Sequence, residues 1–185
     1  MTFQMEELER LADQLRRKTI RGNRREIAVT CCLFVPVNDE LVEGVYVSSD
    51  KIIARMLLVS DPIMAFREHI PHVPRREDRI CVYRARHADD DGGVVAHGCV
   101  VTSPSAADAR HPNNPHPDTY PRVCRLRDVD VYLKEPVRVQ PYYDALDFFG
   151  QHPEARLNPG LRFFGHTHEI TEHDFMLLTR RPGVH

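Results

Sequence analysis

The sequence predicts an α+β fold, in which a curved or closed β-barrel of five to six strands carries peripheral helices. Apolar segments rich in β-branched residues recur through the chain, separated by turns that contain Gly, Pro, Asn and Asp. The segments with helical spacing are short and lie between or outside these strands. A length of 185 residues suits one such domain with an extension, and strands of this number suit a curved or closed sheet.

The N-terminal segment is predicted to be an amphipathic helix over residues 3–17. Its apolar residues stand at the spacing of one helix face: Leu8, Leu11, Ala12 and Leu15. A basic stretch follows, which is either a solvated helix end or an arm that lies on a phosphate backbone. We therefore divide the chain into a helix and basic arm (1–25), the main domain (26–180) and a tail (181–185). The apolar stripe of the helix could also pair with a second copy of the chain.

The first strand of the domain is predicted at residues 27–37, because this run is almost continuously apolar. It ends at Pro36 and at the turn residues Asn38 and Asp39. A short extended segment follows at 44–49. Two segments then have mixed helical character, 51–59 and 61–70, and Ser60 and Pro62 are suited to the first turn of the second one.

The middle of the chain is predicted to contain a β-hairpin over residues 78–102. Residues 78–85 and 94–102 alternate or are continuously apolar, and an acidic, glycine-containing turn separates them. The remaining elements follow in order: a proline-rich loop at 103–119, one or two strands at 122–139, a short helix at 142–149 and a last strand at 161–164.

The C-terminal end reads as a capped helix. Thr171 can serve as its N-cap, and Asp174, three residues later, as the acidic partner of a capping box. Ile170 and Phe175 occupy the two positions of a hydrophobic staple.

Composition indicates an ordinary globular protein, with 42% hydrophobic and 28% charged residues. No apolar run reaches the length of a membrane span, and the N-terminal segment lacks the apolar core of a secretory signal. Five cysteines without a C-x-x-C pair indicate a reducing, cytoplasmic environment and no structural disulfide. A net charge of −2 argues against a large non-specific nucleic-acid footprint, so contacts with phosphate would come from local patches.

Several motifs occur in an order that resembles EVE domains of the PUA-like group, which are related to YTH and ASCH domains. They cover about residues 27–180 and are, in order, the strand ending at Asn38, GVYVS, REDRICVY, GGVVAHGCVVTSP, TYP and LRFFGHTHEITEHDF. The resemblance implies a PUA-like barrel that binds DNA or RNA and accepts a single base, modified or not, in a pocket.

The resemblance also implies site residues. Asn38 matches the polar residue that contacts the base, Tyr46 stands where relatives usually carry tryptophan, and Ser48 is the small polar residue that follows. The chain has no Trp, so Tyr46 would offer a smaller stacking face. Further candidates for pocket walls are Tyr83, Phe163 and Phe164, and candidates for phosphate contacts are Arg75, Arg76, Arg84 and Arg86.

Simpler interpretations remain for these residues. Alternate residues of a strand face opposite sides, so at least one of Phe163 and Phe164 belongs to the core, and Tyr83 is a core candidate as well. Isolated surface arginines are usually solvated.

The eleven histidines raise the question of a metal site. His166 and His168 form an H-x-H pair near His173, the motif HPNNPH contains the pair His111 and His116, and a proline lies between His69 and His72. Zinc needs three or four converging ligands, however, and no Cys or acidic residue stands at diagnostic spacing. We predict no metal and no cofactor.

The alternative function is a hydrolase or other small-molecule enzyme on the same scaffold. Lys51 and Glu43 lie near the pocket strand, whereas Cys31 and Cys32 lie in an apolar strand where thiols are inert. We favour a binding module without a catalytic role.

Overall fold

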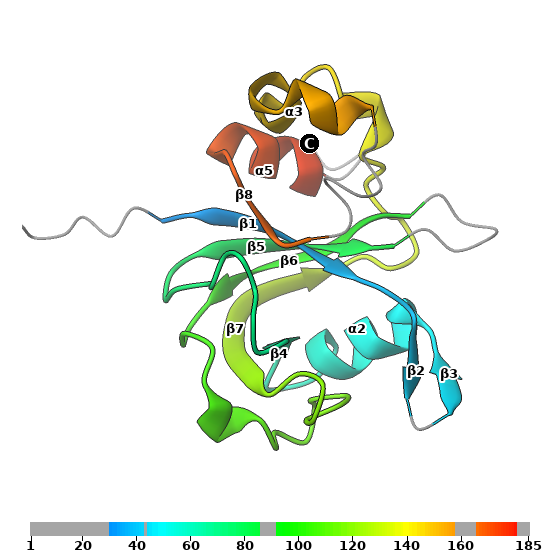
Figure 1. Cartoon of the computed structure of the whole chain (residues 1–185), viewed down its shortest axis with the longest axis vertical. Coiled ribbons are helices and arrows are strands. Elements are labelled where there is room, and N and C mark those ends of the chain that lie inside the picture. The colour runs from blue at the N-terminus through cyan, green and yellow to red at the C-terminus, as the bar shows by residue number, and fades with distance from the viewer. Residues whose placement is uncertain (1–29, 43, 86–91, 158–165, 181–185) are drawn as a thin grey trace, which may run out of the picture.

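A computed structural model describes residues 30–42, 44–85, 92–157 and 166–180. Its main element is a six-stranded sheet with the order β4-β7-β6-β5-β1-β8, in which only β1 and β5 run parallel (Figure 1). A separate two-stranded hairpin follows β1. The strands are β1 (Cys32–Val37), β2 (Glu40–Val42), β3 (Val45–Val47), β4 (Ile63–Phe66), β5 (Arg79–Arg84), β6 (Gly93–Val100), β7 (Arg122–Val131) and β8 (His168–Ile170). The α-helices are α2 (Ser49–Leu57), α3 (Asp147–Gln151) and α5 (Glu172–Thr179).

The sheet curls because one long strand, β7, pairs with two different strands. The first part of β7 pairs with β4 and the rest pairs with β6. Between His97 and Cys99 the register shifts, so that β7 contains an extra residue there. Asp128, in this bulge, has a φ of 52°, a left-handed conformation that Asp tolerates better than most residues. A bulge bends and twists its strand, and it therefore helps to turn the sheet into a half-barrel.

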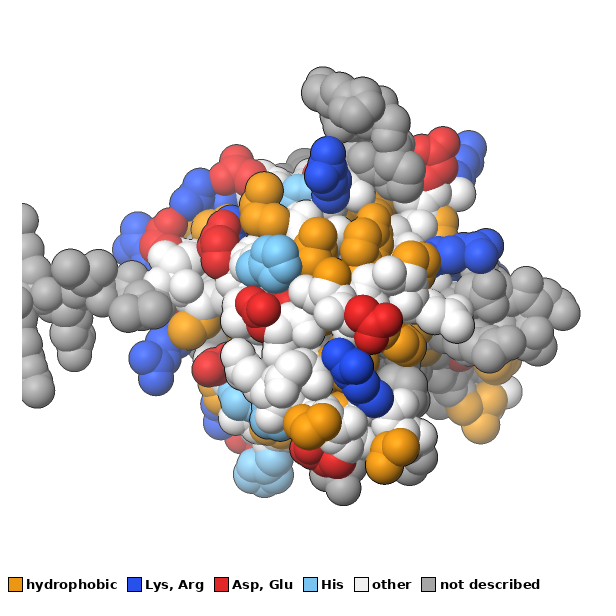
Figure 2. Space-filling view, turned by 90° about the horizontal axis from the view of Figure 1, so that it is seen from above, with side chains coloured by type: hydrophobic (Ala, Val, Ile, Leu, Met, Phe, Trp, Pro, Cys, Tyr) orange, Lys and Arg blue, Asp and Glu red, His pale blue; other side chains and the backbone are white. Residues whose placement is uncertain are grey.

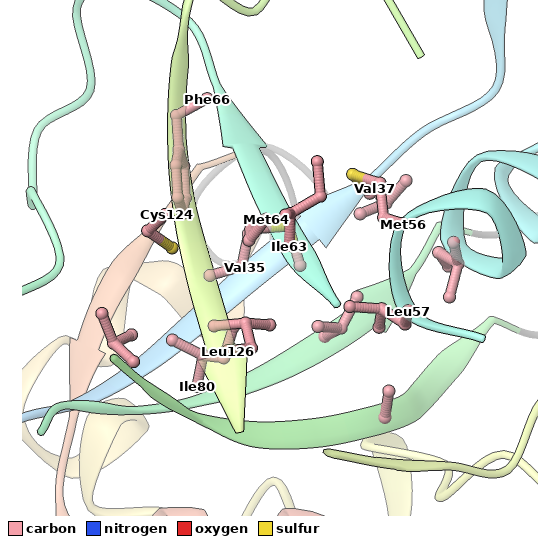
Figure 3. Close-up of a cluster of buried hydrophobic side chains, with 14 of the residues drawn as sticks. Val35, Val37, Met56, Leu57, Ile63, Met64, Phe66, Ile80, Cys124 and Leu126 are labelled. Carbon is pink, nitrogen blue, oxygen red and sulfur yellow. The ribbon is translucent and has the colours of Figure 1, made fainter. Parts of the chain in front are cut away.

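The hollow side of the half-barrel is filled by an apolar cluster that α2 covers (Figures 1 and 3). The buried face of α2 contributes Ile52, Ile53, Met56 and Leu57. Facing residues of the sheet include Val35, Ile63, Met64, Ile80 and Leu126. This cluster forms the floor beneath the end of β1.

The other face of the sheet is covered by α3 and α5 (Figure 1). Phe34 and Tyr83 project there from β1 and β5, with ring centroids 5.2 Å apart. Phe149 of α3 and Leu178 of α5 are fully buried against them. Alternate residues of β1 thus supply both clusters, as the continuous burial of this strand requires.

The structure confirms the predicted α+β class with a curved six-stranded sheet and peripheral helices. The strand ending at Val37, the hairpin formed by β5 and β6, and the C-terminal helix with Thr171 as its N-cap were all predicted. The expected helical character of 61–70 is wrong, because Ile63–Phe66 forms strand β4 and pairs with β7. The predicted helix 3–17, the basic arm, the strand 161–164 and the tail lie outside the described residues, and the last described strand is His168–Ile170.

Gly93 offers a test of the packing at the start of β6. A Cβ atom there would lie 2.9 Å from both Pro136 Cβ and the carbonyl oxygen of Val137. Gly93→Ala is therefore expected to lower the free energy of unfolding by roughly 1–3 kcal/mol through overpacking, measured by denaturant titration. Gly150, in α3, is the control, because a Cβ atom added there would meet nothing within 4 Å. Gly150→Ala should stabilise by about 0.5–1 kcal/mol, and equal losses in the two variants would contradict this account.

Candidate functional site

A cavity of about 650 Å³ opens beside the end of β1. Its floor belongs to the apolar cluster under α2 and includes Val35, Ile52, Met56 and Phe66. Its rim is mainly polar and comes from the segment after β1, the segment after β4, the loop 103–121 and the two residues before β8. Ligand sites of this size typically combine an apolar floor with a few converging polar groups.

One of the predicted pocket residues lines this cavity, and two others lie in the segment that leads from it to α2. Asn38 is exposed and lines it. Tyr46 is not among the lining residues, but its hydroxyl donates a hydrogen bond to the carboxylate of Asp39, which does line the cavity. This hydrogen bond raises the pKa of Tyr46. Ser48 is half-buried and precedes the first turn of α2.

The segment from Asn38 to the start of α2 is organised by Asp39. One of its carboxylate oxygens accepts the hydroxyl of Tyr46, and the other accepts the backbone N–H of Ser49 at 2.6 Å. Ser49 is the first residue of α2, so Asp39 supplies the helix cap that the side chain of Ser48 does not provide. The hairpin β2–β3 is thereby attached to the helix beside it.

The remaining predicted wall residues are not brought to the cavity. Tyr83 is buried in the cluster on the opposite face of the sheet, as the core interpretation expected. Phe163 and Phe164 lie outside the described residues, although His166 and Thr167, which follow them, line the cavity.

The candidate phosphate contacts differ in their surroundings. Arg84 is only 8% exposed, and its guanidinium pairs with Asp50 at 3.1 Å, so it has a structural partner. Arg75 and Arg76 are exposed in the loop before β5. That loop is fixed by Asp78, whose carboxylate accepts the backbone N–H of Arg75 at 2.7 Å. Arg86 lies outside the described residues.

Further polar residues complete the rim, and sequence patterns did not indicate them as pocket residues. Among them are Glu40, Arg67, His69, His116, Thr119 and Tyr120. Burial raises the pKa of the Glu40 carboxyl, and the nearby positive charge of Arg67 opposes that rise. The motif HPNNPH was visible in the sequence, but only as a pair of possible metal ligands.

A hydrogen bond within the loop indicates which ring nitrogen of His116 is the acceptor. Its Nδ1 lies 3.2 Å from the backbone N–H of Thr119, which makes Nδ1 the acceptor. In the neutral ring the proton then belongs to Nε2. His116 can thus offer one N–H donor on the cavity rim, close to the carboxylate acceptor of Glu40.

The loop 103–121 is held in place by Asn114, which is 1% exposed. Its side-chain amide donates to the carbonyl oxygens of Ala109 at 2.7 Å and Tyr120 at 2.8 Å, and its Oδ1 accepts the backbone N–H of His116 at 3.2 Å. Three of the four hydrogen bonds that an Asn side chain can form are therefore made within the loop. Asn114 therefore fixes the part of the rim that carries His116 and Tyr120.

The groups that the alternative chemistries would use are placed as follows in the described residues. No group of three or more His, Cys, Asp or Glu residues could hold a metal ion within the described part of the chain. All five cysteines are free, and burial raises the pKa of Cys124 to about 12 and that of Cys31 above its ordinary value. Such thiols are poor nucleophiles. Lys51 is exposed and does not line the cavity, and Glu43 lies outside the described residues.

On the face that carries α3 and α5, basic and acidic side chains are interspersed with apolar ones (Figure 2). The described residues of this face show no broad basic field of the kind that non-specific nucleic-acid binding uses. No helix among the described residues is long and apolar enough to cross a membrane.

Comparisons with known proteins give matches only at the level of structure. Neither the family models nor the curated proteins searched match the sequence. Human THYN1 protein, solved in complex with 5-methylcytosine containing DNA, matches with a TM-score of 0.45 and 12% identity, over 83% of this chain and 100% of that chain. Rpa0253 from Rhodopseudomonas palustris, solved by NMR, matches with a TM-score of 0.42 and 13% identity, over 80% of this chain and 90% of that chain. Both are likenesses of structure at low sequence identity.

Proposed function

We propose that this chain is a nucleic-acid-binding module that accepts one extruded base, modified or unmodified, in the cavity at the end of β1. The observation that carries the proposal is the cavity itself, which has an apolar floor and a mainly polar rim that includes Asn38. The EVE-type sequence pattern gives the base-contacting role to this same residue.

The rim offers the chemistry that base recognition needs. Asn38 provides an amide donor and acceptor, Glu40 a carboxylate acceptor and His116 an N–H donor. Tyr46 is 57% exposed beside the cavity, so its ring can stack on a base. Stacking recovers about 1–3 kcal/mol per base, which offsets much of the cost of extruding a base.

Contacts with phosphate are assigned to Arg75 and Arg76, which are exposed. A protein with a net charge of −2 would bind through a few such cations. We therefore expect a shallow dependence of affinity on salt concentration, set by the number of phosphates contacted.

A binding screen tests the proposal. Short single- and double-stranded DNA and RNA, with and without one methylated or hydroxymethylated base, are titrated at one salt concentration by fluorescence anisotropy. The first set includes 5-methylcytosine, the base present in the DNA of the THYN1 complex.

Two variants locate the site. Asn38→Ala should weaken binding about tenfold, through one lost hydrogen bond to the base. Tyr46→Ala should weaken it by roughly one stacking contribution, whereas Tyr46→Phe, which keeps the ring, should retain binding. Circular dichroism should show an unchanged fold, because both side chains are exposed. Absence of binding to every nucleic acid would refute the proposal and favour a small-molecule ligand in the same cavity.

A further inference from the structure

Leu41, the middle residue of β2, combines two properties. It lines the cavity, and yet 74% of its surface is exposed. A large apolar side chain at the mouth of a binding cavity gains stability only when something covers it. Leu41 is therefore placed to contact whatever surrounds a ligand group that enters the cavity.

The hairpin that carries Leu41 projects from the half-barrel beside α2 (Figure 1). Tyr46 is the residue directly opposite Leu41 in the antiparallel pair, so the two side chains share one face of the hairpin. Asp39 ties this hairpin to α2 through Tyr46 and the backbone N–H of Ser49. Leu41 thus stands on a fixed support, next to an exposed aromatic ring.

We propose that Leu41 is a wedge that enters the base stack of a double-stranded nucleic acid and fills the gap left by the extruded base. The inference rests on the proposed function and adds the class of substrate, a duplex. Extrusion of a base costs unpairing and unstacking and leaves an apolar gap. Apolar side chains inserted between base steps are a recurrent way to stabilise such an opened duplex.

Cations lie where the backbone of such a duplex could pass. Arg67 is exposed on the cavity rim. Lys51 is exposed in the first turn of α2, directly before Ile52, which lines the cavity. Positive charges there favour nucleic acid over an apolar protein partner as the occupant of the hairpin face.

Leu41→Ala tests the wedge against matched substrates. One preferred strand from the binding screen is titrated alone and in a duplex of the same sequence. Loss of the wedge should reduce the affinity for the duplex roughly tenfold. The affinity for the single strand should change less than about twofold, because little base stacking has to be opened there. A mismatch opposite the target base should restore much of the lost duplex affinity, since that base is easier to extrude.

The control variant is Leu157→Ala, which removes a leucine that is 89% exposed and does not line the cavity. It should change neither affinity. The wedge proposal would be overturned if Leu41→Ala reduced the affinities for single strand and duplex equally, or did not reduce the affinity for the duplex. If Asn38→Ala still weakened binding in that case, the base pocket would stand without it, whereas failure of the proposed function appears as absence of binding by the unaltered protein.

Discussion

Asp174→Ala is expected to destabilise the protein by roughly 3–4 kcal/mol, the loss expected for charge-assisted hydrogen bonds to buried backbone donors. Asp174 is fully buried on α5, and its carboxylate accepts the backbone N–H groups of Asp147 at 2.7 Å and Phe148 at 3.1 Å. These are the first two residues of α3, so α5 caps α3 with this side chain. Denaturant unfolding would measure the loss.

The control is Asp147→Ala. The Asp147 carboxylate is exposed, and among the described groups it accepts a hydrogen bond only from the hydroxyl of Thr171, at 2.8 Å. Its removal should cost less than about 1 kcal/mol. Comparable losses in the two variants would show that Asp174 does not join the helices. Asp174→Asn should lie between them, since an amide oxygen still accepts hydrogen bonds.

The dependence on pH follows from the same burial. Burial raises the pKa of Asp174 in the folded protein above its unfolded value, so folding favours the protonated carboxyl. The contribution of Asp174 to the free energy of unfolding is therefore largest below the pKa of the unfolded state. It falls as the pH rises from that pKa to the higher pKa of the folded state. The Asp174→Asn variant should lack this part of the dependence.

Asn114→Ala is expected to cost roughly 3 kcal/mol, about 1 kcal/mol for each of three hydrogen bonds. The change leaves two carbonyl groups and one N–H inside the loop 103–121 without their partner. Because this loop carries His116 and Tyr120 on the cavity rim, binding of a base should weaken as well. Chemical denaturation and the anisotropy titration measure the two effects.

Asn113→Ala is the neighbouring comparison. The Asn113 amide is half-buried and donates one hydrogen bond to the carbonyl of Asp61, at 3.0 Å. Its loss should cost about 1 kcal/mol. If Asn114→Ala were no more damaging than Asn113→Ala, the loop would be held by other contacts.

The parts of the fold that could be predicted have local signals. The apolar run of β1 and the cap at Thr171 each specify an element within about ten residues, and the structure contains both. At residues 61–70 the local signal, Ser60 and Pro62 at the start of an expected helix, is misleading. There the strand Ile63–Phe66 exists because it pairs with the distant Arg122–Arg125, and pairing of this kind overrides local preference.

The residues around the cavity were predictable only in part. Asn38, which lines the cavity, was named because of the resemblance to EVE domains, and its contact with a base stays a prediction. His116 was seen but assigned to another chemistry, since its place beside Glu40 depends on how the loop 103–121 folds back. The alternation of residues along β5 shows that Tyr83 shares a face with its second neighbours. Alternation alone does not show on which face of the sheet the cavity lies.

The pairing of β1 on both sides also matters while the chain is being synthesised. β5, its parallel partner, and β8, its antiparallel partner, leave the ribosome at very different times. Until β8 emerges, Cys32–Phe34 offers an open strand edge to neighbouring nascent chains. We expect a polypeptide cut before Thr167 to keep this open strand edge and to aggregate more readily than the whole chain, because β8 is the strand that covers it.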